Sequence, residues 1–168
     1  MWRPFEIIEP LVKTLKPDVY VELGIYKFET MLKILPFVNR AIGVDIKSLT
    51  VPNKKIEFYS MTTDKFYEQN RDKLIIDFLF IDADHSDKQT LQDFINYSKI
   101  VKENGIIVLH DTYPENENHL SLSKCGTAYK AADYIRKNYC KDYEIMTIPV
   151  FPGMSLVRKS SKQLYWKK

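Results

Sequence analysis

The segment IIDFLFI (residues 75–81), followed at once by DADH (residues 82–85), decides the fold that we predict for this chain. Six of the seven residues of IIDFLFI are apolar, and such a nearly continuous run is typical of a strand that is buried on both faces of a sheet. Sheets of this kind have parallel strands and carry helices on both sides. The polar residues that follow mark the point where the strand reaches the edge of the sheet.

Helical and extended patterns alternate on both sides of this segment. Apolar residues at helical spacing predict helices over 5–15, 29–35, 63–72, 88–102 and 127–139. Short β-prone runs predict further strands over 19–23, 41–45, 56–59 and 106–109. The alternation predicts a parallel sheet between two layers of helices, and right-handed crossovers limit it to doubly wound topologies.

Two more predicted strands, 143–148 and 154–158, close the chain around Pro149, Pro152 and Gly153, with no helix between them. This pattern predicts a hairpin, so one strand at the edge of the sheet should be antiparallel. We therefore predict a doubly wound, Rossmann-like α/β fold: a mostly parallel seven-stranded sheet with an antiparallel C-terminal strand and helices on both faces. Such an ending is typical of methyltransferases rather than of dehydrogenases.

Carboxylates and histidines gather where the predicted strands end. In doubly wound sheets the ligand lies beyond the carboxyl ends of the strands. Four of the first five strands end in a carboxylate, and two of the three histidines lie at the same edge: Glu22, Asp45, Asp82, His85, His110 and Asp111. An acid about 20 residues beyond the first turn holds ribose hydroxyls in dinucleotide sites, and Asp45 fits that role for an adenosine-containing ligand. As an alternative, Asp45 could cap the loop that follows it.

The segment Val21–Thr30 resembles the first motif of class I S-adenosylmethionine (SAM)-dependent methyltransferases. It keeps Glu22 and Gly24, but Phe28 stands where a second glycine is usual. The resemblance implies SAM as cofactor, held by residues at the strand ends: Glu22, Gly24, Tyr26, Thr30, Asp45, Ser60, Met61 and Asp82. The chain lacks the G-x-G-x-x-G pattern, which argues against a nicotinamide cofactor.

Residues 78–86 and 104–112 resemble one subgroup more closely, the metal-dependent O-methyltransferases that include cephalosporin-biosynthesis-like and macrolide-sugar enzymes. In that subgroup acids after the fourth and fifth strands hold a divalent metal, which implies Asp82, His110 and Asp111 here. Carboxylates suit magnesium, whereas His110, in place of a glutamate, would favour manganese, iron or zinc. His85, three residues after Asp82, matches the general base and can take a proton near neutral pH.

The sequence therefore predicts a SAM-dependent methyltransferase that methylates a hydroxyl of a small molecule such as a sugar, assisted by magnesium or manganese. Two alternatives stay open: a SAM-binding module without catalysis, suggested by Phe28, and a metal-dependent phosphoesterase, suggested by the aspartates and histidines. Asp84, His85 and Ser86 could also cap the helix that follows them. We expect His119 to face solvent and Cys125 to be a small residue at the start of a helix.

Composition bounds the remaining expectations. The chain has 168 residues and a formal net charge of +3 with interspersed charges, so we expect no nucleic-acid partner. It has no apolar run long enough to span a bilayer. Two cysteines and no apolar leader favour a cytoplasmic protein. We expect one domain over 1–158, a basic tail over 159–168, and a homo-oligomer, because no cap domain covers the ligand edge.

Overall fold

The structure is a computed structural model that describes residues 3–159, so the predicted basic tail, apart from Lys159, lies outside the described residues. Its strands are β1 (Val19–Leu23), β2 (Arg40–Asp45), β3 (Ile56–Ser60), β4 (Ile76–Ile81), β5 (Val101–His110), β6 (Tyr143–Ile148) and β7 (Met154–Lys159). Its helices are α1 (Phe5–Leu15), α2 (Glu29–Ile34), α3 (Thr63–Asn70), α4 (Asp87–Tyr97) and α5 (Ala128–Asn138), with short 3₁₀ turns η1 (Leu35–Phe37) and η2 (Glu117–His119). Among the described residues, no helix combines the length and apolar character needed to cross a membrane.

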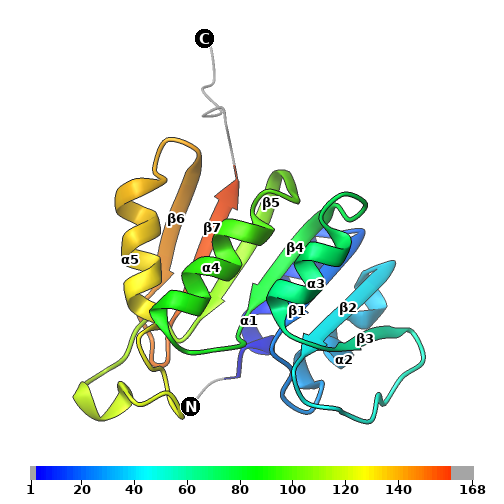
Figure 1. Ribbon diagram of the computed structural model, residues 1–168, viewed down its shortest axis with the longest axis horizontal. Coiled ribbons are helices and arrows are strands. Elements are labelled where there is room, and N and C mark those ends of the chain that lie inside the picture. The colour runs from blue at the N-terminus through cyan, green and yellow to red at the C-terminus, as the bar shows by residue number, and fades with distance from the viewer. Residues whose placement is uncertain (1–2, 160–168) are drawn as a thin grey trace.

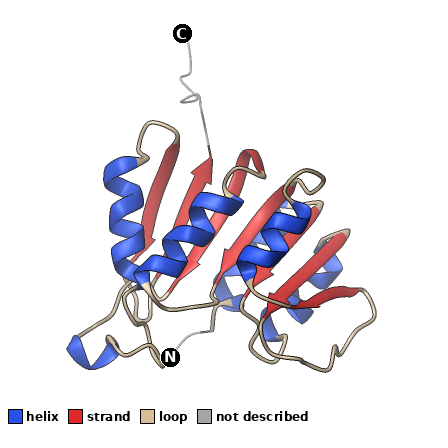
Figure 2. Ribbon diagram, viewed as in Figure 1, coloured by secondary structure: helices blue, strands red, loops and turns tan. Residues whose placement is uncertain are grey.

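The predicted fold class is confirmed. The seven strands form one sheet in the order β3-β2-β1-β4-β5-β7-β6, and β1 to β5 are all parallel (Figure 1). Helices α3, α4 and α5 cover one face and α1 and α2 the other (Figure 2). The chain order reverses between β1 and β4, which is where ligands of such sheets bind.

The antiparallel strand is not at the edge, and that part of the prediction is wrong. β7 lies between β5 and β6 and is antiparallel to both. The side chains explain the order: Met154, Ser155 and Val157 of β7 are fully buried, whereas exposed and partly buried side chains alternate along most of β6, with Met146 60% exposed. Burial therefore places β7 inside the sheet and leaves β6 as its edge.

The apolar run that predicted β4 serves both cores at once. Phe78 and Phe80 pack with α1 and α2, while Leu79 and Ile81 pack with α3, α4 and α5. Successive side chains of a strand point to opposite faces, so a strand covered on both sides needs apolar residues at nearly every position. Ile75 precedes the strand and is 67% exposed.

The helix predicted over 88–102 ends earlier than expected. α4 stops at Tyr97, and β5 begins at Val101 beside Ile76 of β4. The helical spacing of Val101 misled the prediction, because its side chain is 1% exposed and packs in the sheet core. The Asn104–Gly105 turn expected before β5 instead lies within an irregular stretch of that strand, where Asn104 has φ +61°.

The turn after β1 takes a conformation that favours glycine at three positions, Gly24, Lys27 and Phe28. Gly24 has φ +88°, and a Cβ there would lie 2.1 Å from the carbonyl oxygen of Asp82. Phe28 has φ +58°, although it is not glycine. Its ring is 3% exposed and packs edge-on against Phe58, with ring centroids 5.5 Å apart. Phe28 therefore has the left-handed backbone conformation that a glycine would adopt at this position, and its side chain packs in the core.

We predict that Phe28→Gly is more stable than Phe28→Ala, by about 0.5–1 kcal/mol, in urea denaturation. Both variants lose the packing of the ring, but only alanine pays the left-handed backbone penalty, which exceeds its entropic advantage in the unfolded chain. The order should reverse at the buried helical position Met31 of α2, where Met31→Gly should be the less stable variant by about 1 kcal/mol. Equal stability of both Phe28 variants would show that residue 28 does not hold the left-handed conformation.

Candidate functional site

A cleft of about 760 Å³ lies at the carboxyl ends of the parallel strands. The turn after β1 and the end of β2 form one wall, with Gly24, Tyr26, Thr30 and Asp45. The ends of β4 and β5 form the floor, and the loop after β5 and the β6–β7 turn close the far side. The side chains on the floor and far side include Asp82, Asp84, His85, His110, Asp111, His119, Leu122, Lys124, Cys125, Phe151 and Pro152.

Five of the eight predicted cofactor-binding residues line this cleft: Gly24, Tyr26, Thr30, Asp45 and Asp82. The other three, Glu22, Ser60 and Met61, are not among its lining residues. All four predicted catalytic or metal-binding residues also line it, so residues predicted for two separate tasks share one cavity.

The end of β2 holds the turn after β1 through Asp45. Its Oδ2 accepts a hydrogen bond from the backbone N–H of Ile25 at 2.8 Å, and its Oδ1 accepts one from that of Lys47 at 2.7 Å. These bonds fix the plane of the carboxylate, and each oxygen keeps a further lone pair. Asp45 thus presents a fixed acceptor to the cleft and also caps its loop, so the two roles considered for it are compatible.

Glu22 lies beneath the cleft. Its side chain is 3% exposed, and its Oε2 accepts a hydrogen bond from the Tyr20 hydroxyl at 2.8 Å. Burial raises the pKa of Glu22 to about 8, against the effect of the Tyr20 bond. At neutral pH the carboxyl group is therefore mostly protonated, which suits a buried support for the strand ends.

Asp82, His85 and Asp111 form a compact cluster in which one potential ligand atom from each lies within 4.8 Å of the others. The Nε2 atom of His85 is 3.2 Å from Oδ2 of Asp111 and 3.7 Å from Oδ1 of Asp82. Asp111 is 5% exposed, whereas Asp82 and His85 are partly open to the cleft.

His85 has a defined orientation. Its Nδ1 hydrogen-bonds to the backbone carbonyl oxygen of Lys124. A carbonyl only accepts, so Nδ1 carries the proton, and in the neutral ring Nε2 is the unprotonated nitrogen. A carboxylate also only accepts, so Nε2 donates to Asp111 or Asp82 only when the ring is protonated. The backbone carbonyl of His85 accepts from the N–H of Thr127 at 2.7 Å, which ties this residue to the start of α5.

His110 lies between the two acids. Its Nδ1 is 2.9 Å from Oδ1 of Asp82 and 3.3 Å from Oδ2 of Asp111. Burial lowers the pKa of His110, but the charge of Asp82 and hydrogen bonds to Asp111 and Asp82 outweigh it and raise the pKa to about 10. His110 is therefore a cation at neutral pH, and it is His85 that joins the three-membered cluster.

The residues on either side of His85, and not His85 itself, stabilise the start of α4. Ser86 is the N-cap of α4, since its Oγ accepts from the N–H of Gln89, and Asp84 accepts from the N–H of Ser86 at 2.7 Å. Of the three residues considered as caps of this helix, Ser86 is the N-cap. The His85 ring takes no part in capping the helix and lines the cleft.

The far wall was not predicted. His119, expected to face solvent, instead lines the cleft and stacks on Phe151 with ring centroids 4.1 Å apart. That loop folds back on the β6–β7 turn, a long-range contact that local sequence does not encode. Cys125 is 1% exposed, and burial raises the pKa of its thiol to about 12, which agrees with its reading as a small structural residue.

Three solved structures share this fold. An O-methyltransferase from Bacillus cereus in complex with SAH has a TM-score of 0.75 at 12% identity, covering 95% of this chain and 83% of that protein. A Staphylococcus aureus protein provisionally assigned as a caffeoyl-CoA O-methyltransferase has a TM-score of 0.74 at 11% identity, covering 95% and 85%. The SAH-bound methyltransferase PaMTH1 from Podospora anserina has a TM-score of 0.69 at 14% identity, covering 95% and 80%.

At such low identities these structures establish the fold alone. No curated protein sequence matches the chain significantly. A sequence model of the methyltransferase domain does match, over residues 28–112, which is half of the chain. The matched region runs from the turn after β1 to the end of β5 and so contains most of the cleft floor. The chain belongs to the methyltransferase domain family.

Proposed function

We propose that this chain is a SAM-dependent O-methyltransferase of a small hydroxyl-bearing molecule, with a divalent cation at Asp82 and Asp111 and His85 as general base. The observation that carries the proposal is the single cleft, which joins a fixed acceptor for ribose hydroxyls, Asp45, to the acid–histidine cluster. We assign residues 1–158 to this domain. A sugar is the acceptor class that the sequence resemblance suggests.

The wall formed by Gly24, Tyr26, Thr30 and Asp45 would hold SAM, which supplies an already activated methyl group. Two proteins of the same fold are bound to SAH, which supports SAM as the cofactor. Gly24 lines the cleft and lets the turn pack against the Asp82 peptide, and Asp45 would accept hydrogen bonds from ribose hydroxyls. Glu22 supports the turn from below and would not contact the cofactor.

The donor set of the cluster fits a divalent cation. Asp82 and Asp111 bring two carboxylates together, and carboxylate oxygens are the ligands that magnesium and manganese accept. His85 would stay outside the coordination of the cation, so that its Nε2 can act as the base. Such a cation would lower the pKa of a bound acceptor hydroxyl. The imidazolium of His110 would neutralise part of the negative charge and hold Asp82 in place.

His85 is suited to remove the proton of the acceptor hydroxyl. The Lys124 carbonyl keeps the hydrogen on Nδ1, so Nε2 is the atom that takes a proton. Asp111, 3.2 Å from Nε2, would stabilise the imidazolium that forms. The Lys124 carbonyl on Nδ1 fixes the tautomer and the orientation of the ring, which a positioned base requires.

The two alternative functions lose support. Phe28 motivated a SAM-binding module without catalysis, but its ring lies in the core and its backbone keeps the glycine conformation. A two-metal phosphoesterase needs more ligands than the one three-membered cluster found in residues 3–159.

We predict that Asp45→Asn weakens SAH binding by about 10-fold or more in isothermal titration calorimetry. Hydrogen bonds to a charged acceptor contribute about 1.5–3 kcal/mol, and asparagine keeps the shape but loses the charge. Asp72→Asn, which removes a carboxylate that is 94% exposed, is the matched control and should bind SAH like the wild type. Wild-type protein without measurable SAH binding would disprove the cofactor assignment.

We predict that Asp111→Asn abolishes manganese or magnesium binding measured by calorimetry in the presence of SAH, while SAH affinity stays within about 3-fold. The reason is that the cation and SAH would lie against different strands. Asp84→Asn is the control, because Asp84 lines the same cleft but is outside the three-membered cluster. Isotherms that do not differ between Asp111→Asn and wild type would remove the metal from the proposal.

We predict that His85→Ala still binds the cation and SAH but slows methyl transfer by roughly 10²–10⁴-fold, the usual contribution of a positioned base. The assay measures SAH release with a panel of hydroxyl compounds, from which the acceptor is first identified with wild-type protein. Loss of cation binding in His85→Ala would instead make His85 a metal ligand and would refute its assignment as the base.

A further inference from the structure

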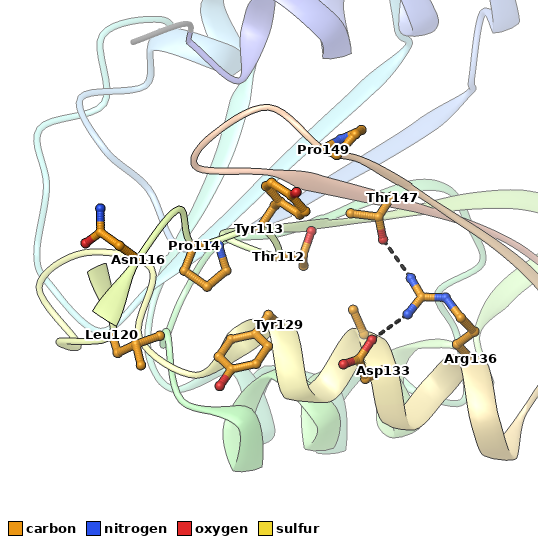
Figure 3. A pocket seen from close by; sticks show the side chains of 11 residues that line it. Thr112, Tyr113, Pro114, Asn116, Leu120, Tyr129, Asp133, Arg136, Thr147 and Pro149 are labelled. Atoms are coloured by element: carbon orange, nitrogen blue, oxygen red, sulfur yellow. Dashed lines mark hydrogen bonds and ion pairs between the residues drawn. The ribbon is translucent and has the colours of Figure 1, made fainter. Parts of the chain in front are cut away.

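A second pocket of about 500 Å³ lies on the other side of the loop that follows β5, between that loop and α5 (Figure 3). Arg136 and Asp133 of α5, Thr147 of β6 and Thr112 of the loop line it. Thr112 directly follows Asp111, which lines the cleft. The candidate metal ligand Asp111 therefore lines the cleft, and the next residue, Thr112, lines the second pocket.

Asp111 holds an unusual backbone conformation. Its φ is +58°, in the left-handed region that costs a residue with a side chain about 1–2 kcal/mol. Such a conformation persists only where surrounding contacts impose it. One contact is the backbone N–H of Tyr113, which donates to the carbonyl of Pro152 at 2.9 Å. Gly153 allows this close approach, since a Cβ there would lie 2.2 Å from that nitrogen.

His85 and His110 hold the carboxylate of Asp111 directly. A further contact, on the side of the second pocket, is a chain of hydroxyl groups that ends at Thr112. Arg136 donates from Nη2 to Oγ1 of Thr147 at 2.8 Å, as Figure 3 shows. Thr147 and Ser155 lie 2.8 Å apart at their hydroxyl oxygens, and Ser155 donates to Oγ1 of Thr112 at 2.9 Å. Ser155 is fully buried and Thr112 is 5% exposed, so water does not compete for the bond between them. The Arg136 end of the chain is exposed, and its guanidinium also pairs with Asp133.

The chain runs in one direction. Ser155 gives its single proton to Thr112, so Thr147 donates to Ser155. Thr147 in turn accepts from Arg136, since arginine only donates hydrogen bonds. A chain with all donors aligned is mutually polarised and strengthened in a buried setting. The side chain of Thr112, and with it the backbone at Asp111, is thereby held from the surface of α5.

We propose that Thr112, Ser155, Thr147 and Arg136 are positioning residues that hold Asp111 in its left-handed conformation and so set the strength of the cation site. The proposal rests on the metal role of Asp111 given above. Apolar residues of the same shape would fill this buried space at little cost in stability, so the polar chain points to a task other than packing. Partners that orient a metal ligand typically contribute 10–100-fold to affinity.

The test compares Thr112→Val, which keeps the shape and removes the hydroxyl, with Thr112→Ser, which keeps the hydroxyl. Manganese is titrated calorimetrically in the presence of SAH. Thr112→Val should bind manganese about 10-fold more weakly, Thr112→Ser should bind within about 3-fold of wild type, and SAH affinity should not change in either. Manganese affinity that is equal in the valine variant and the wild type would overturn the proposal.

Two further variants probe the rest of the chain. Ser155→Ala should weaken manganese binding as Thr112→Val does, and the double variant should be no weaker than either single one, because both break the same chain. Arg136→Met should weaken binding several-fold. Lys137→Met removes the same charge from the neighbouring, exposed position of α5 and should have no effect. If Arg136→Met and Lys137→Met weakened manganese binding equally, the effect would be one of long-range charge, and this result would contradict the proposed role of the hydrogen-bonded chain.

A readout without metal separates this inference from the proposed function. Backbone dihedral angles from NMR chemical shifts should place Asp111 in the left-handed region in wild type and Thr112→Ser, and outside it in Thr112→Val. If wild type binds no cation, the metal role fails, and the dihedral of Asp111 still decides whether the chain positions it. A left-handed Asp111 in all variants refutes the positioning role.

Discussion

The site depends on how closely the ends of β1 and β4 approach each other. The N–H of Asp82 donates to the carbonyl of Leu23, and the N–H of Gly24 donates to that of Val44, each at 2.8 Å. At the turn, only a residue without Cβ fits against the Asp82 peptide. These contacts bring the ends of β1, β2 and β4 together, so that Gly24, Asp45 and Asp82 line a single cleft although they are far apart in the chain.

Gathering carboxylates at one edge is electrostatically unfavourable, and the fold compensates each of them differently. Asp45 accepts two backbone N–H groups. Glu22 is buried and keeps its proton, with a pKa of about 8. Asp82 and Asp111 share the imidazolium of His110. Asp45 keeps its charge but stands alone, whereas Asp82 and Asp111 bring two carboxylates together, which is why we place a cation between them.

The sequence predicted those features of the fold that are determined by residues close to one another along the chain. β1 and α1 were predicted to the residue, and β4 was recognised because burial on both faces leaves almost no polar positions. The position of β7, the early end of α4 and the stacking of His119 on Phe151 were missed. Each of these depends on contacts between segments far apart in the chain, for which periodicity and local propensity hold no information.

Phe28 and Asp111 show why a glycine motif is an incomplete guide to such a site. Both adopt the left-handed backbone, with φ +58° at each, and both lie where the chain turns away from a strand toward the cleft. Core packing imposes the conformation on Phe28, and hydrogen bonds impose it on Asp111. The requirement at these turns is a backbone conformation that clears the cleft. Glycine meets it at the lowest cost, but a buried ring or a tethered neighbour meets it as well, and a search for glycine alone then understates the likeness to the family.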